Sequence, residues 1–144
     1  MKKLLPILFV LIITSCSKEV PSDQLVERDG IYYEVNSQTG FTGTSISYYE
    51  NGQLWEKITY TNGELDGVHE RYYENGQLKY RINFKDDKYD GPYESHHNNG
   101  QLWYKTTYKN GKEEGLSESY SQNGELKFSG CYKNGDSIDM SYCD

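Results

Sequence analysis

The side chains best suited to bind a metal ion or to transfer a proton near neutral pH are the three histidines, His69, His96 and His97. His96 and His97 are adjacent, and adjacent residues of a strand point to opposite faces of a sheet. They therefore do not chelate one ion together, and they stand where other parts of the chain carry a pair of tyrosines. This pattern indicates the exchange of one flat ring for another, so the sequence predicts no metal site.

Carboxylates recur at a fixed spacing, at Glu70, Glu94 and Glu118. Such positions would lie two strands apart in a sheet, at about 10 Å, which exceeds the separation usual for a glycosidase pair. The acidic run Asp86-Asp87 is typical of a solvated turn, because Asp tolerates left-handed geometry. Phosphate loops, nucleophile elbows, zinc spacings and calcium loops do not occur in the sequence. We therefore predict a protein that is not an enzyme and uses no cofactor.

The composition excludes several other classes of protein. The 144 residues include 15 Tyr and 14 Gly but no Ala, the strongest helix former, which disfavours a helical bundle. Only 35% of the residues are hydrophobic, too few for an α/β enzyme with a large buried core. The net charge of -7 disfavours a nucleic-acid partner, since binding to phosphates requires basic residues.

The elements that must position these residues are β-hairpins. Asn-Gly pairs between alternating hydrophobic runs are the strongest short-range hairpin signal, because both central residues of a type I′ turn need positive φ. The run Tyr48–Leu54 recurs every 24 residues, at 72–78, 96–102 and 120–126. These repeats predict an all-β fold, an elongated single-layer antiparallel β-meander built from 24-residue β-hairpin repeats, with about nine strands between Ile31 and Tyr132.

A two-residue Asn-Gly loop also fixes which residues face each other across a hairpin. The predicted pairs are Glu70 with Arg81, Glu94 with Lys105, Tyr72 with Lys79, His96 with Trp103, and Tyr48 with Trp55. Opposite charges and aromatic rings thus meet across strands, which is the pattern that stabilises a sheet.

The same register predicts a row of side chains on one face of the ribbon. The candidate binding face consists of Tyr48, Trp55, Tyr72, Arg81, His96, Trp103, Lys105 and Tyr120. Two interpretations remain open. The rings stiffen the sheet, or they form a binding platform, because exposed Trp and Tyr with Arg nearby is the composition of an interface.

The N-terminus has the pattern of a targeting segment. A basic start and an apolar run predict a signal peptide over residues 1–15, too short to span a bilayer. The run that ends Thr14-Ser15-Cys16 resembles the bacterial lipoprotein signal, which implies an acylated (palmitate-bearing) Cys16 and a lipidated tether over residues 16–29. Ser17 after the cysteine favours the outer membrane over the inner membrane of a bacterial cell envelope.

Two further cysteines lie near the C-terminus. Cys131 and Cys143 would be in an oxidising compartment, where pairing is plausible. A disulfide that pins a C-terminal cap or tail over residues 136–144 and a pair of free thiols remain as alternatives, because sequence does not supply the geometry.

The Tyr-Tyr-x-Asn-Gly-x-Leu run, the second Asn-Gly eleven residues later and the closing Asp-Gly resemble the MORN-repeat variant. The resemblance covers a repeat domain over residues 30–135, and such repeats are typical of bacterial proteins described as YwqK-like antitoxins. The sequence departs from the pattern at His96-His97, at Asp86-Asp87 and at Asp139.

The resemblance implies a protein-interaction module with an antitoxin or immunity role. The expected protein is a membrane-anchored lipoprotein whose partner is an unknown protein, such as a toxin, or an envelope component. The alternative function is carbohydrate or cell-wall binding through the aromatic face.

Overall fold

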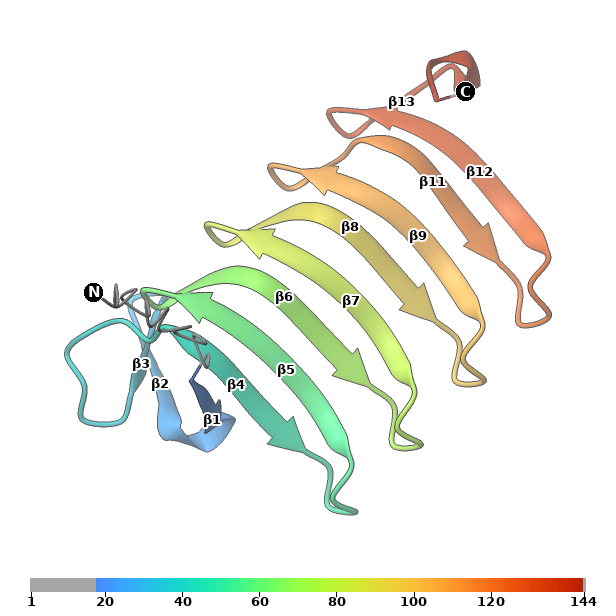
Figure 1. Cartoon of the computed structure of the whole chain (residues 1–144). Coiled ribbons are helices and arrows are strands. Elements are labelled where there is room, and N and C mark those ends of the chain that lie inside the picture. Colours follow the sequence, from blue (N-terminus) through green and yellow to red (C-terminus); the bar gives the residue numbers. More distant parts are fainter. Residues whose placement is uncertain (1–17, 144) are drawn as a thin grey trace, which may run out of the picture.

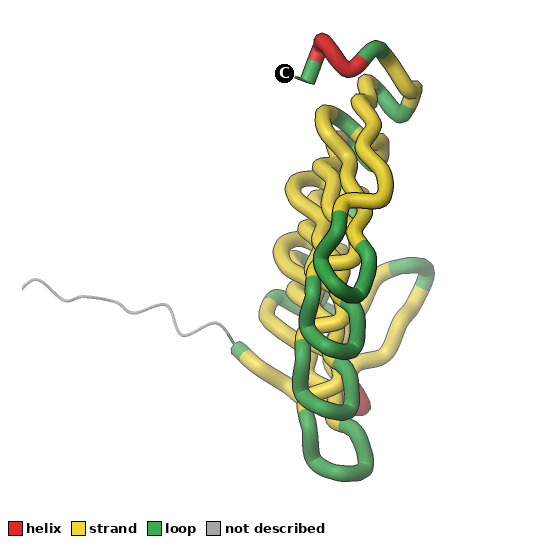
Figure 2. The backbone as a smooth tube through the Cα atoms, turned by 90° about the vertical axis from the view of Figure 1, so that its right-hand side faces the viewer, coloured by secondary structure: helices red, strands yellow, loops and turns green. Residues whose placement is uncertain are grey.

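A computed structural model describes residues 18–143 of the chain, and most of them form one curved sheet of consecutive hairpins (Figure 1). The order across this 11-stranded sheet is β1-β4-β5-β6-β7-β8-β9-β11-β12-β13, and β10 pairs with β9. The strands are β1 (Glu19–Pro21), β4 (Gly43–Tyr48), β5 (Leu54–Thr61), β6 (Glu64–Tyr72), β7 (Leu78–Lys85), β8 (Lys88–His96), β9 (Leu102–Lys109), β10 (Lys112–Glu113), β11 (Gly115–Tyr120), β12 (Leu126–Lys133) and β13 (Asp136–Ile138). Seen from the side, the sheet is one layer thick (Figure 2). The predicted single-layer β-meander of 24-residue repeats is confirmed.

The hairpins end in two different kinds of turn. At one end of the strands, Asn62 and Gly63 both have positive φ, 53° and 89°, as the predicted type I′ turn requires. At the other end, the Gly52 N–H donates to the Tyr49 carbonyl at 2.9 Å, and the Tyr49 N–H donates to the Gln53 carbonyl at 2.8 Å. Of the residues in this turn, only the glycine has positive φ. This geometry is that of a three-residue hairpin loop with a glycine bulge. The two-residue loop predicted there is wrong.

A β-bulge follows each of these longer loops and changes the register beside it. Tyr72 lies opposite Leu78 rather than Lys79, and the register shifts between Arg71 and Tyr72. Beyond the bulge the predicted register returns, so the pairing of Glu70 with Arg81 is confirmed.

In the other hairpins, too, the predicted pairs beyond the bulge are correct and those beside the loop are not. The pair of Glu94 with Lys105 is confirmed. The aromatic pairs predicted for Tyr48 and His96 are wrong, since these residues face Leu54 and Leu102.

Residues 19–28, which belong to the tether predicted over residues 16–29, form two strands and a short 3-10 turn. Strand β1 pairs in parallel with β4 and covers that edge of the sheet. After a short 3-10 turn (Ser22–Gln24), β2 (Leu25–Arg28) and β3 (Ile31–Glu34) form a separate two-stranded sheet, so the strand predicted at Ile31 is not part of the main sheet. The physical reason is hydrophobic burial, because Val20 packs with Phe41 and Tyr60 in the buried core cluster.

The predicted signal peptide and Cys16 lie outside the described residues.

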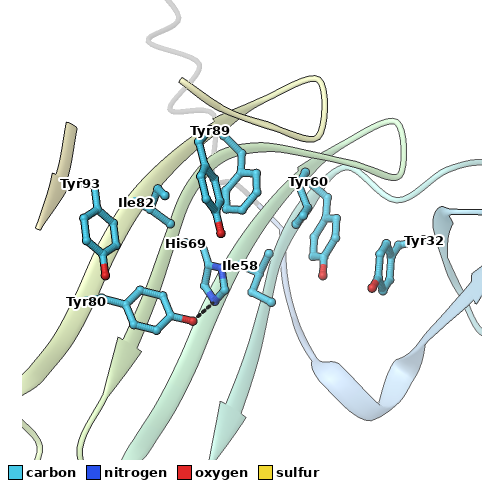
Figure 3. A pocket seen from close by; sticks show the side chains of 10 residues that line it. Tyr32, Ile58, Tyr60, His69, Tyr80, Ile82, Tyr89 and Tyr93 are labelled. Atoms are coloured by element: carbon cyan, nitrogen blue, oxygen red, sulfur yellow. Dashed lines mark hydrogen bonds between the residues drawn. The ribbon is translucent and has the colours of Figure 1, made fainter. Parts of the chain in front are cut away.

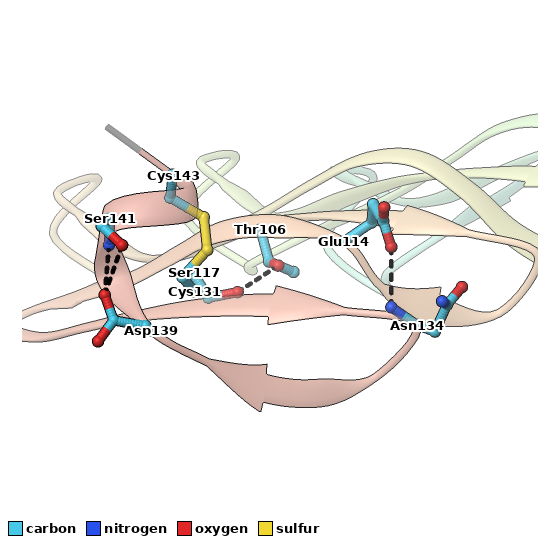
Figure 4. Close-up of a disulfide and its surroundings, with 8 residues drawn as sticks. All are labelled: Thr106, Glu114, Ser117, Cys131, Asn134, Asp139, Ser141 and Cys143. Atoms are coloured by element: carbon cyan, nitrogen blue, oxygen red, sulfur yellow. Dashed lines mark hydrogen bonds between the residues drawn. A yellow bond between two sulfur atoms is a disulfide. The ribbon is translucent and has the colours of Figure 1, made fainter.

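The C-terminus is held against the last hairpin. The sheet continues into β13, and a 3-10 turn (Met140–Tyr142) follows. A disulfide joins Cys131 to Cys143 with a Cα–Cα distance of 5.9 Å (Figure 4), which is the paired arrangement of the two that the sequence left open. Among residues 18–143, no helix is long and apolar enough to cross a membrane.

Candidate binding site

One face of the sheet carries a row of alternating charges, which we call the charged face. Cross-strand pairing places its members side by side in the order Lys57, Glu70, Arg81, Glu94, Lys105 and Glu118. The guanidinium of Arg81 bridges two carboxylates, Glu70 at 2.7 Å and Glu94 at 3.1 Å. The Lys105 ammonium lies 2.6 Å from Glu118. The recurring carboxylates are therefore parts of ion pairs between strands, as the sequence analysis proposed.

The charged face also lowers the pKa values of two of its carboxylates, Glu70 and Glu118. Burial opposes ionisation of Glu70, but hydrogen bonds from Tyr72 and Arg81 and the charges of Arg81 and Lys57 together hold its pKa below the ordinary value. The hydrogen bond from Lys105, with a smaller one from Tyr120, lowers the pKa of Glu118. These carboxylates stay charged near neutral pH and stabilise the sheet, which leaves them poorly suited to act as general acids.

The opposite face carries most of the rings and is hollowed by an aromatic groove. Ile58, His69, Ile82 and Tyr93 are paired across strands β5 to β8 and so lie in one row on this face. Figure 3 shows the tyrosines of β5 and β8 projecting into one space that Tyr32 enters from β3.

The groove consists of two adjoining pockets. One has a volume of about 350 Å³, and the other has a volume of about 470 Å³. They share Ile82, Tyr89 and Tyr93, so they form one continuous depression across the repeats. A second row on the same face supplies the rest of the floor, with Tyr80, Ser95 and Tyr104 paired across β7, β8 and β9. A long apolar depression with a few polar atoms is the usual form of a binding site.

The rings of the groove pack against one another at tilted angles. Tyr89 lies with its ring centroid 4.9 Å from that of Phe84 and 5.2 Å from that of Tyr108, both in edge-to-face geometry. Burial, and to a lesser degree the hydrogen bond to Glu113, raises the pKa of Tyr104 to about 12. Burial also raises the pKa of Tyr60 to about 12. The tyrosines therefore present neutral hydroxyls and aromatic faces to a ligand at physiological pH.

The groove contains one small polar cluster. The His69 Nε2 lies 3.0 Å from the Glu56 carboxylate and 3.3 Å from the Tyr80 hydroxyl, and the Tyr80 contact is drawn in Figure 3. His96 and His97 lie elsewhere, and His97 Nε2 contacts the Tyr120 carbonyl at 3.0 Å. Within residues 18–143, no group of three potential metal ligands comes together. His69 and His97 thus serve as hydrogen-bonding rings, whereas the buried Nδ1 of His96 has no hydrogen-bond partner in the described part of the chain.

The structure divides the predicted binding face between the two sides of the sheet. Arg81 and Lys105 lie in the charged row. Tyr72 and Tyr120 lie on the same face, since their hydroxyls donate to Glu70 and Glu118 at 2.8 and 2.9 Å. Tyr48 and His96 hold the corresponding positions of the first and third repeats, and Tyr48 is 61% exposed.

The two tryptophans belong to the aromatic side. Trp103 lines the larger pocket together with Tyr104, the next residue in the chain. The ring of Trp55 lies 4.8 Å beneath the guanidinium of Arg71, which is paired with Tyr80 on the aromatic face. The bulge places the tryptophans on this side of the sheet, because an extra residue in one strand interrupts the alternation of side chains between faces. The prediction of a single row is therefore wrong.

Hydrogen bonds that connect neighbouring repeats were missed by the sequence analysis. The Tyr49 hydroxyl donates to the Tyr72 carbonyl at 2.7 Å, and the Tyr73 hydroxyl donates to the His96 carbonyl at 2.7 Å. The amide of Asn75 donates to the Asn98 carbonyl at 2.8 Å and so connects consecutive turns. The signal was present as the second ring of each Tyr-Tyr pair, which recurs one repeat apart.

Comparison with known proteins agrees with the repeat seen in the structure. The MORN repeat variant matches residues 41–62, 65–86, 89–110 and 113–134 of the chain. These four segments together cover more than half of the sequence. No curated protein and no solved structure matches the chain.

Proposed function

Because the chain belongs to the MORN repeat variant family, we propose that it is a non-catalytic interaction module that binds a protein partner through its aromatic groove. The observation that supports this proposal is the groove itself, which is open, continuous across β5 to β9 and lined by Tyr, Trp and Ile side chains. Tyr and Trp dominate the energetically important centres of protein interfaces.

The exposure of individual rings adds further support. Trp103 is 53% exposed and Tyr89 is 41% exposed, although both lie beside other apolar groups. Large rings left in water next to a depression mark an interaction surface, whereas isolated exposed hydrophobic residues need no explanation. The aromatic groove is therefore a better candidate for the binding surface than the charged face, whose groups neutralise one another.

A matched pair of variants tests the role of the groove. Trp103→Ala removes a ring from the groove, and Leu126→Ala removes an equally exposed (53%) side chain that lines neither pocket. We expect Trp103→Ala to weaken capture of the partner from native membranes by about tenfold or more. Leu126→Ala should leave capture unchanged, and both variants should keep the circular dichroism of the sheet. Full capture by Trp103→Ala would contradict the proposal.

We further propose that Cys16 is acylated and anchors the protein to the bacterial envelope, most favourably at the outer membrane. The signal-like sequence before Cys16 supports this part of the proposal. The test is metabolic labelling with a palmitate analogue. The wild-type chain should be labelled and sediment with membranes, and Cys16→Ser should be unlabelled and soluble. A labelled Cys16→Ser chain would exclude this anchor.

An antitoxin or immunity role is the narrower form of the proposal. It requires a toxin that acts in the envelope, because an exported lipoprotein cannot reach a cytoplasmic target. A toxin-like reading frame beside the gene would support this role. Viability of a clean deletion beside an intact toxin would count against it.

Carbohydrate or cell-wall binding is the second candidate function, and one part of the surface favours it. Trp103 also borders a more open pocket of about 500 Å³ that Tyr73, Asn98 and Gln122 line. An exposed indole next to amide side chains can stack on a sugar ring and bond to its hydroxyls. Pull-down on insoluble glycans distinguishes the candidates, since a glycan ligand protects the tryptophan fluorescence without any cross-linked protein.

A further inference from the structure

The larger pocket of the groove is surrounded by aromatic rings. Tyr89, Tyr93, Trp103, Tyr104 and Tyr108 line it, and together they come from strands β8 and β9. The ring centroids of Tyr93 and Tyr104 are 6.0 Å apart, and those of Tyr89 and Tyr108 are 5.2 Å apart. The faces of such rings carry partial negative charge, so a cluster of them attracts a cation.

The electrostatic surroundings of this pocket are acidic. The Tyr104 hydroxyl donates to the Glu113 carboxylate at 2.5 Å. Burial has the largest effect on the pKa of Tyr108 and raises it, and the negative charge of Glu113 raises it further. No Lys or Arg lines the pocket among the described residues. The whole chain is acidic as well, with a net charge of -7.

The floor of the pocket holds a polar atom whose role the fold does not explain. Ser95 is 4% exposed and lines the pocket between the rings. Its hydroxyl has no hydrogen-bond partner within the described part of the chain. Buried polar groups are nearly always bonded, so an unsatisfied one needs a reason. The oxygen is buried, so it adds polarity beneath the pocket and makes no direct contact with a ligand.

From these three observations we propose that the pocket binds the ammonium group of a lysine side chain from a basic segment of the partner protein. The aliphatic part of the lysine lies against the exposed rings of the pocket, and its ammonium meets their faces on the side of Glu113. This inference rests on the proposed function, because it assigns the chemistry of the partner that the groove takes.

The test uses peptides that differ only in charge. The full-length protein is titrated with capped Gly-Gly-Lys-Gly-Gly and with the same peptide in which norleucine replaces lysine, while nuclear magnetic resonance follows the indole signal of Trp103. We expect the lysine peptide to bind about tenfold more tightly than the norleucine peptide. Equal affinities, or no binding of either peptide, would overturn the inference.

Variants localise the effect to this pocket. Tyr89→Phe keeps the ring and should retain the preference for lysine, whereas Tyr89→Leu should lose it. Ser95→Ala should leave the preference for lysine unchanged and should not lower the melting temperature, because it removes a buried group without a hydrogen-bond partner. Glu113→Gln should reduce the preference, and Glu94→Gln, which removes the same charge from the opposite face, should not.

A third probe addresses the second candidate function. If a neutral chitin trisaccharide binds and the lysine peptide does not, the inference is overturned in favour of a sugar site. The outcomes also separate this inference from the proposed function. Partner capture can depend on Trp103 while the two peptides bind equally. That result supports the proposed function and rejects only the assignment of lysine as the group that the pocket binds.

Discussion

The hydroxyl of Tyr73 donates a hydrogen bond to the main-chain carbonyl of His96, 2.7 Å away in the next repeat. We predict that Tyr73→Phe lowers the free energy of unfolding by about 1 kcal/mol, since it leaves a part-buried carbonyl without its donor. Tyr48→Phe serves as the control, because the Tyr48 side chain is 61% exposed. Denaturant unfolding followed by circular dichroism measures both variants, and equal stabilities would show that this bond contributes nothing.

Two glycines with similar backbone angles differ in the space around them. Gly52 has a φ of +82° with nothing within 4 Å of an added Cβ, whereas at Gly63, with a φ of +89°, the Cβ would lie 2.3 Å from Ile31 and 2.7 Å from the Tyr32 carbonyl. Gly52→Ala should cost only the strain of positive φ, about 1–2 kcal/mol.

Gly63→Ala should cost clearly more, because the β2–β3 hairpin must move away from the turn. Thermal unfolding of the two variants measures the difference. Hydrogen exchange should show the extra loss of protection in β3 first. A Gly63→Ala protein as stable as Gly52→Ala would mean that the hairpin adjusts at no cost.

The disulfide should protect mainly the end of the sheet that it closes. Cys131 and Cys143 are 12 residues apart, and closing a loop of that size stabilises a protein by about 3 kcal/mol. Repeats contact only their neighbours, so we predict that reduction exposes the amides of β12 and β13 to hydrogen exchange. The amides of β5 to β8 should stay protected. Loss of protection along the whole sheet would show that the repeats unfold as one unit.

Three tyrosines should ionise only at a pH above the ordinary tyrosine value. The pKa values of Tyr60, Tyr72 and Tyr104 are raised to about 12, in each case first by burial. Because folding raises these values above the ordinary 10.0, their contribution to stability is complete below pH 10 and is lost as the pH rises towards 12.

Near-ultraviolet absorbance of tyrosinate measures this titration. The three tyrosines with raised pKa values should ionise only as the β signal is lost. Ionisation of these three side chains near pH 10.0 with the β signal intact would contradict the prediction.

The sequence was sufficient to predict the fold and part of the register. The pairing of Glu70 with Arg81 follows from strand periodicity and turn position, and it is correct although the local turn is not the predicted one. The loop has one residue more than expected, and the following bulge takes up that residue, so the two deviations cancel beyond Arg71.

The binding site could be predicted less well. A bulge depends on main-chain geometry that period-two alternation does not contain, and it moves Trp103 to the face that alternation assigns to Tyr104. The parallel pairing of β1 was not predicted either, because a three-residue strand with one buried residue, Val20, resembles a polar linker in the sequence. The aromatic composition predicted a row of exposed rings, and the bulges determine the face on which the two tryptophans lie.

The two ends of the sheet differ from its middle, and this difference limits how a ribbon of this kind can change its length. The first edge is covered by β1 and the last hairpin is held by the disulfide, so the ends are specialised while the units between them are interchangeable. The bonds from Tyr49 and Tyr73 each reach a carbonyl 23 residues further along the chain. Insertions or deletions of one whole unit preserve this spacing, and any other length breaks it. The reach of the groove is thus set in discrete steps by the number of copies.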